Sequence, residues 1–119
     1  MNNLNKIGQI LFALPFGIFG LFHFMMGSQM AGMVPSWVPG GVFWVYVTGL
    51  ALVAAAVSLI IKKYAFYAAL GLALLMYVFV LTIHLPSLMG GDQMAMTMVL
   101  KDFGLGSAAL LVAHLNPKD

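Results

Sequence analysis

Four ionisable side chains lie within or at the ends of long apolar runs: His23, His84, Lys101 and Asp102. The chain around them is 63% hydrophobic and only 7% charged over its 119 residues. Ionisable groups in such surroundings are costly and are functional candidates by default. Imidazole can give or accept a proton, and ammonium and carboxylate groups can hydrogen-bond a polar ligand. These residue types therefore indicate one polar site in an apolar protein.

The helical rise of 1.5 Å per residue places these groups at similar depth. His23 lies about 25 Å along its apolar run, His84 about 30 Å along a parallel one, and Lys101 about 21 Å back from the end of an antiparallel one. Tyr77 lies two turns below His84 on the same face, so a His–Tyr or a His–Asp hydrogen bond is possible. The predicted ligand-binding residues are His23, Trp37, Tyr77, His84, Lys101 and Asp102.

A purely structural role explains the same residues. Both histidines come at the ends of apolar runs, where an imidazole can meet lipid headgroups. Lys101 can extend its stem toward the membrane surface. A buried Lys–Asp or His–Asp pair can serve only to hold helices together. The sequence leaves a ligand pocket and a structural pair both open, and it leaves open which histidine pairs with Asp102.

The same residues could belong to a metal or a haem site. Two histidines on parallel helices of a bundle could ligate a b-type haem. Eight of the ten methionines lie toward the same side, and thioethers select Cu(I). Methionine is also a flexible apolar filler, and alternate residues of a helix point about 200° apart. The chain has no cysteine, which excludes thiolate sites. The sequence therefore disfavours haem b and copper and predicts no metal site.

The elements that position these residues are four apolar runs, each near the roughly 20 residues that cross a bilayer. The predicted helices are Ile7–Met26, Val42–Ile61, Tyr64–Leu85 and Gln93–Leu115. The third is expected to stop at Pro86. The fourth must include Lys101 and Asp102, because backbone polar groups in hydrocarbon need helical partners. The first run is longer than the core of a signal peptide, so we expect it to be retained.

The lysines predict the topology. Lys6, Lys62, Lys63 and Lys118 fall on one side if the helices alternate in direction, and positive charge favours the cytoplasm. The predicted fold is an all-α integral membrane protein: a four-helix up-down bundle, one domain over residues 1–119, with segment 27–41 as an outer capping loop. Both termini are expected in the cytoplasm of a bacterium, with the helices in its inner membrane. The low basic content argues against nucleic-acid binding.

Stripes of small residues predict close helix packing in the absence of a hydrophobic driving force. The first helix carries Ala13, Gly17 and Gly20 on one side. In the last helix, Asp102 shares a stripe with small residues that include Gly106. We therefore expect Asp102 to point into the bundle and not toward lipid.

Four segments together resemble the DoxX-like family over essentially the whole chain. They are GIFGLFHFMMG, MVPSWVPGG, WVYVTG and LKDFGLGSAALLVAHL. The features that recur in that family correspond here to His23, to Pro35, Trp37 and Pro39 in the loop, and to Lys101, Asp102 and Gly106 in the last helix.

The resemblance implies a four-helix membrane subunit, since members are linked to quinone-dependent oxidation of sulfur compounds and to membrane-bound oxidoreductase complexes. We expect a redox-associated subunit with an outer pocket for a quinone or another small hydrophobic ligand. The alternatives are a non-enzymatic accessory or scaffold subunit of a larger membrane complex, and a small-molecule or metal carrier. No nucleotide or flavin motif is evident, so catalysis would need a partner oxidoreductase or a bound cofactor. The expected partners are the lipid bilayer and other membrane protein subunits.

Overall fold

The computed structural model describes residues 3–34, 36–37 and 39–118, and every regular element within them is helical. The predicted loop residues Pro35 and Val38 lie outside this description. The elements are α1 (Asn3–Met25), α2 (Gly27–Met30), the 3₁₀ turn η1 (Ala31–Met33), α3 (Val42–Ile61), α4 (Ala65–Phe79), the π turn η2 (Val80–His84), α5 (Leu85–Met89) and α6 (Ala95–His114).

Four helical stretches are long and apolar enough to cross a membrane: Asn3–Met25, Val42–Ile61, Ala65–Met89 and Ala95–His114. The all-α prediction is therefore confirmed, and the second stretch has the predicted bounds. Part of the predicted capping loop is itself helical, because α2 and η1 occupy residues 27–33.

The third stretch does not end at Pro86, as the sequence suggested. It continues through α5 to Met89, after the π turn η2. Proline lacks an amide hydrogen and crowds the carbonyl one turn back, which normally breaks a helix. A π turn widens the helix locally and changes the hydrogen-bonding register, so the strain is absorbed there. The Thr82 hydroxyl also donates to the Val78 carbonyl at 2.7 Å, and the Ser87 hydroxyl donates to the Ile83 carbonyl at 2.9 Å.

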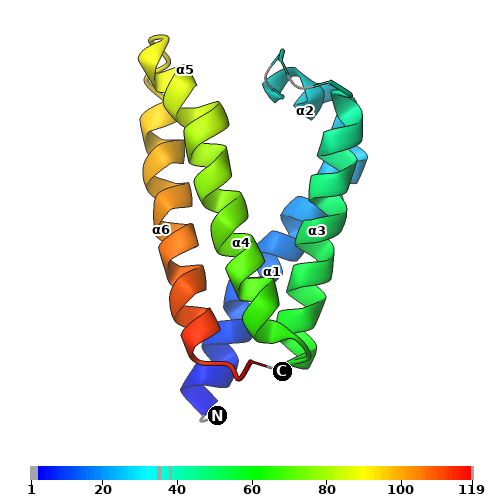
Figure 1. The fold of residues 1–119 in the computed structure, drawn as a ribbon, viewed down its shortest axis with the longest axis vertical. Coiled ribbons are helices and arrows are strands. Elements are labelled where there is room, and N and C mark those ends of the chain that lie inside the picture. Colours follow the sequence, from blue (N-terminus) through cyan, green and yellow to red (C-terminus); the bar gives the residue numbers. More distant parts are fainter. Residues whose placement is uncertain (1–2, 35, 38, 119) are drawn as a thin grey trace.

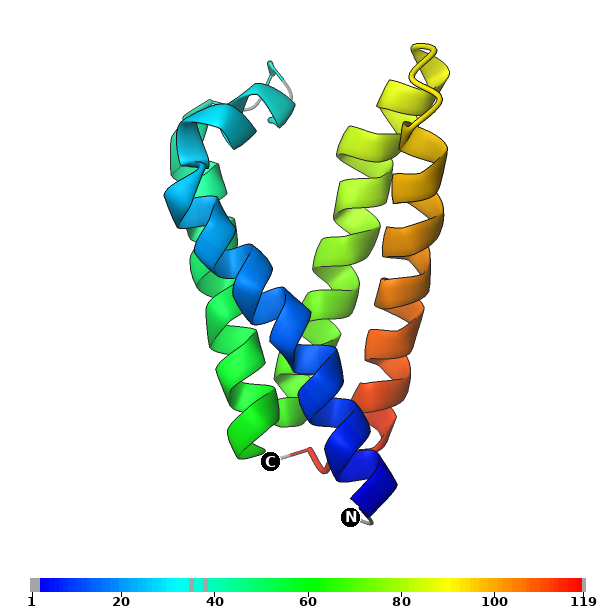
Figure 2. The same ribbon diagram turned by 180° about the vertical axis from the view of Figure 1, so that it is seen from behind.

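The long helices form two pairs, in which α1 packs on α3 and α4 on α6. Both termini and the α3–α4 connection lie at one end, which we call the terminal end, and α2 and α5 lie at the other, the loop end (Figure 1). The pairs converge at the terminal end and diverge toward the loop end. Seen from behind, α1 crosses from the foot of α6 to the upper part of α3 (Figure 2). The molecule is 44 Å long.

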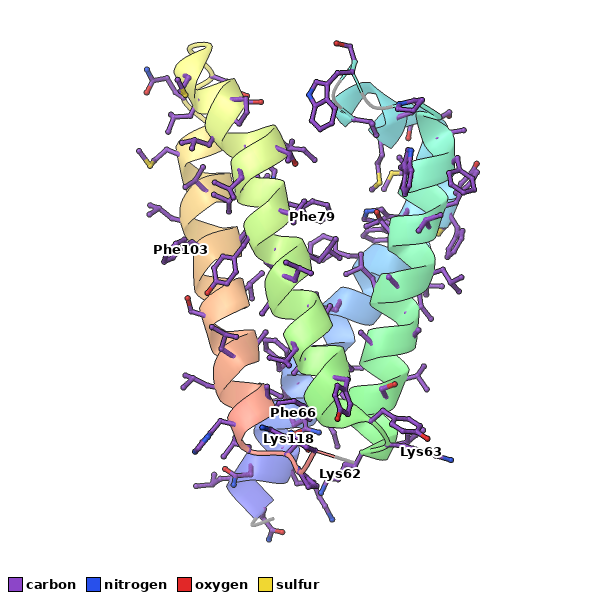
Figure 3. All side chains as sticks on the ribbon, in the orientation of Figure 1. Lys62, Lys63, Phe66, Phe79, Phe103 and Lys118 are labelled. Atoms are coloured by element: carbon purple, nitrogen blue, oxygen red, sulfur yellow. The ribbon has the colours of Figure 1, made fainter. Side chains whose placement is uncertain are left out.

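The connection from α3 to α4 is very short. Lys62 and Tyr64 adopt left-handed backbone angles (φ 61° and 59°), which reverse the chain between the two helices. The Lys63 amide donates to the Ser58 carbonyl at 3.1 Å and closes the end of α3. Lys62, Lys63 and Lys118 lie together at the terminal end (Figure 3), where Lys118 Nζ sits 5.5 Å from the centre of the Phe66 ring.

Two buried amide side chains join the helix pairs at the terminal end. Gln9 on α1 donates through Nε2 to the Leu59 carbonyl of α3 at 2.8 Å. Asn116, just beyond α6, donates through Nδ2 to Gln9 Oε1 at 2.8 Å and to the Val112 carbonyl at 2.8 Å. Gln9 is 3% exposed and Asn116 8%. We call this set the amide clamp.

The α1–α3 contact depends on glycine. A Cβ atom at Gly20 would lie 2.8 Å from the Gly49 carbonyl oxygen and 2.6 Å from Val53 Cγ2. A Cβ atom at Gly17 would lie 3.3 Å from the Cβ of Ala56. Ala13, on the same stripe, is completely buried. The predicted small-residue face of the first helix is therefore where α3 packs.

We expect Gly20→Ala to destabilise the protein, because the Gly49 backbone cannot move away without separating α1 from α3. Overpacking of this kind costs about 1–3 kcal/mol. Thermal unfolding in detergent should show a lower midpoint than the native chain. Gly104→Ala is the matched control, since a Cβ atom there meets nothing within 4 Å. Equal midpoints for the two variants would contradict the proposed role of Gly20.

Candidate functional site

A histidine, an aspartate and a lysine form a connected polar group between η2 and α6. His84 Nε2 lies 2.9 Å from Asp102 Oδ2, and Lys101 Nζ lies 3.5 Å from Asp102 Oδ1. Asp102 is 4% exposed and His84 9%, whereas the Lys101 side chain is 42% exposed. Of the two histidines that could have paired with Asp102, the structure therefore selects His84.

Local structure explains this pairing. Asp102 lies on the small-residue stripe of α6, as the sequence predicted, and the stripe faces α4 and η2. His84 is the last residue of the π turn, whose extra residue per turn rotates the following side chains relative to those of α4. π turns occur frequently at functional sites. The turn that accommodates Pro86 thus also positions the imidazole.

The second histidine, His23, forms its hydrogen bond through Nδ1, whereas His84 forms its own through Nε2. His23 Nδ1 lies 2.6 Å from the Phe19 carbonyl oxygen, which can only accept, so Nδ1 carries the proton. In the neutral ring, His23 Nε2 is then a free acceptor. The Asp102 carboxylate similarly holds the proton of His84 on Nε2 and leaves Nδ1 as the acceptor.

All four long helices contribute to a cavity of about 490 Å³. Its polar lining comes from His23, Thr48, Thr82, His84, Lys101 and Asp102. The remaining walls are apolar and include Phe16, Leu52 and Phe79. Phe79 extends from α4 into the space between the helix pairs, whereas Phe103 lies on the other side of the α4–α6 pair (Figure 3). The cavity occupies the region in which the two pairs diverge.

Five of the six predicted site residues line this cavity: His23, Trp37, His84, Lys101 and Asp102. Trp37 does so while remaining 75% exposed. Met30 and Val34 from the predicted capping segment also contribute to the cavity wall.

Tyr77 does not line the cavity. Its hydroxyl lies 2.9 Å from Ser107 Oγ, and its ring packs against the Phe103 ring with centroids 5.6 Å apart. The ring fits between α4 and α6 because Gly106 has no side chain; a Cβ atom there would lie 3.0 Å from the ring. The two-turn spacing between Tyr77 and His84 predicts that both side chains lie on one face of the helix. The π turn between them changes the angle between the two side chains, so they point in different directions.

Lys101 connects the polar group to the opposite helix pair. Its ammonium nitrogen lies 5.5 Å from the centre of the Phe19 ring on α1, within cation–π range. Phe19 also supplies the carbonyl that orients His23. The two polar parts of the cavity, His84–Asp102 and His23, therefore meet through Lys101 and Phe19.

Sequence reasoning missed Thr48 and Thr82, because isolated threonines in apolar runs carry no positional signal. Met30 and Met98 line the cavity, but no three or more His, Asp, Glu or Cys side chains of the described residues are grouped to hold a metal ion. The donors that a ligand would meet are nitrogen and hydroxyl groups on a mainly apolar surface. That arrangement can hydrogen-bond the oxygens of a small hydrophobic molecule.

We expect His84 and Asp102 to be energetically coupled. His84→Ala removes the nearer of the two partners of the buried Asp102 carboxylate, which costs about 1–3 kcal/mol. In a double-mutant cycle with Asp102→Asn, the two effects should differ from additivity by about 0.5–3 kcal/mol, measured from unfolding in detergent. A cycle of Gln9→Leu with Asp102→Asn should be additive, because the amide clamp lies at the terminal end. Additivity in the His84 cycle would refute the pair.

Comparison with known proteins gives one family match. Residues 12–114 match the family model described as a domain of unknown function, DUF8561. No curated protein and no solved structure matches the chain. The matched span includes every residue that lines the cavity and excludes both amides of the clamp. Since it covers most of the sequence, the protein belongs to the DUF8561 family.

Proposed function

We propose that the protein is an integral membrane protein that binds a small, hydrophobic, oxygen-bearing ligand of the quinone type in the cavity. The observation that carries this proposal is the chemistry of the cavity walls. They are apolar over most of their area, yet an ammonium group and two oriented imidazoles reach them. The volume of about 490 Å³ falls within the roughly 300–1,000 Å³ typical of ligand sites.

Insertion in a bilayer is supported by dimensions and surface. The molecule is 44 Å long, and a bilayer with its headgroups is about 40–45 Å thick. Large apolar side chains are exposed along every long helix, including Leu11, Leu50, Leu74 and Leu111. Soluble monomers rarely expose apolar surface of that extent. We place the helices in an up-down arrangement, with the lysine-rich terminal end in the cytoplasm and the membrane the bacterial inner one.

The hydrogen-bonding groups fit a quinone and its reduced form. Lys101 can donate to a carbonyl oxygen of the ligand, since its ammonium group has three donors and only one is directed at Asp102. The free nitrogens of neutral His23 and His84 can accept from a hydroxyl group. A quinone offers the first kind of oxygen and a hydroquinone the second. One site could therefore hold both oxidation states.

A redox-associated role rests on the DoxX-like sequence features, which include His23, Trp37, Lys101 and Asp102. The chain itself offers no cysteine for thiol redox chemistry. We therefore propose a ligand-binding subunit that works with a partner oxidoreductase and other membrane subunits, because the oxidant or reductant must come from elsewhere.

A scaffold subunit is the second candidate, and one observation favours it. Asp102 is already paired with His84 and Lys101, and among the described residues no fully buried side-chain nitrogen or oxygen lacks a hydrogen-bond partner. An ion pair of this kind can specify helix packing with no ligand present.

The proposal is tested by filling the cavity. The protein is purified with native lipids, and bound small molecules are extracted and identified by mass spectrometry. Thr48→Trp should abolish the enrichment of a quinone-type compound, because the indole would occupy the cavity that Thr48 lines. Thr97→Trp is the matched control, since Thr97 is exposed on α6 and lies outside the cavity. No enriched ligand in the native protein would favour the scaffold role.

Topology has a separate test. The native chain has no cysteine, so a single Lys62→Cys variant can be labelled without background. We expect a membrane-impermeant maleimide to label this variant only after the cytoplasmic side is opened. Asp92→Cys, in the connection at the loop end, should be labelled in intact cells. The reverse pattern would invert the proposed orientation.

A further inference from the structure

A second hollow runs along the surface between α3 and α4. It has a volume of about 480 Å³, and most of its lining residues are nearer in sequence to the α3–α4 connection than the cavity residues of the same helices. Small residues create it: Ala51, Ala54, Ala55 and Ser58 on α3, with Ala68 and Gly71 on α4. A Cβ atom at Gly71 would meet nothing within 4 Å, so the hollow is open at that point. We call this hollow the groove.

The groove and the cavity share one lining residue. That residue is Val78 of α4. On α3, Ala51 lines the groove, and Thr48, one turn nearer the loop end, lines the cavity. On α4 and η2, Val78 is followed one turn later by Thr82 in the cavity wall. The groove and the cavity therefore lie next to each other along α3 and α4.

The dimensions of the groove fit an extended hydrocarbon chain better than a helix. Its lining extends from Tyr64, just before α4, to Val78, about 21 Å along a helix, so a hollow of about 480 Å³ is long and narrow. An α-helix has a diameter of about 10–12 Å with its side chains and could rest only on the rim. An extended hydrocarbon chain is a narrow rod of single carbon atoms and fits within it.

We propose that the groove holds the hydrocarbon tail of the ligand whose polar head occupies the cavity. This inference rests on the proposed function and narrows the ligand class to long-tailed lipids. From His84 to Tyr64 the path is about 30 Å along the helices, comparable to the thickness of the hydrocarbon core. The tail leaves the cavity between α3 and α4, and Gly71 and the alanines provide the space it needs.

The test compares two probes of the same head, a benzoquinone without a tail and the same benzoquinone with a decyl tail, bound to protein in nanodiscs. Gly71→Phe should fill the groove without an internal clash. We expect it to weaken binding of the decyl probe about tenfold, a change of 1.4 kcal/mol, and to leave binding of the tailless probe within about twofold. Gly104→Phe is the control, since that position is equally open and lies in neither hollow.

Unchanged binding of the decyl probe to Gly71→Phe would overturn the tail site while leaving the head site intact. Failure of both probes to bind the native protein would overturn the proposed function itself.

A photoreactive group at the end of the tail gives a second measurement that does not depend on the variants. It should cross-link to residues of the groove, and excess tailless probe should abolish the cross-link. A cross-link that survives this competition would mean that the groove holds ordinary bilayer lipid, and this outcome would also refute the proposal.

Discussion

The amide clamp at the terminal end is the interaction on which the shape of the molecule depends. Gln9 donates a hydrogen bond to the Leu59 carbonyl of α3. It accepts another from Asn116, which lies just beyond α6. Three helices are thereby fixed at one end by hydrogen bonds in buried surroundings, where an unpaired amide would be costly. Within each pair, glycine permits close contact: Gly20 against α3, and Gly106 against the Tyr77 ring. Helices held this way at one end are free to diverge at the other.

The divergence of the two helix pairs creates the cavity. If the pairs remained in contact along their whole length, the side chains of α1 and α6 would fill the interior and no cavity would form. Instead, Lys101 of α6 meets Phe19 of α1 across the opening, and His84 and His23 orient separately on either side. Each imidazole is oriented by one protein partner and still lines open space. Among the described residues, no fully buried side-chain nitrogen or oxygen is left without a partner around this opening.

The sequence predicts the helices well because hydrophobic run length is a strong signal, and α3 begins and ends where expected. It also predicts that Asp102 points inward, because the small-residue stripe shows which face packs. It fails at Pro86, where a proline alone does not reveal that a π turn will absorb it. The same turn explains why Tyr77, expected to share a face with His84, bonds Ser107 instead.

The cavity and the clamp depend on facts that no local pattern contains. Gln9 and Asn116 are 107 positions apart, and each is an isolated amide in its own segment. The angle between the helix pairs follows from the sum of such contacts. Depth along each helix could therefore place His23, His84 and Lys101 in one layer, but it could not show that a space lies between them. The groove follows from the same geometry. The tight turn at Lys62 and Tyr64 holds α3 and α4 together, and small residues between them leave the groove, which shares Val78 with the lining of the cavity. A ligand with a compact polar head and a slender apolar tail has the shape of that combined space.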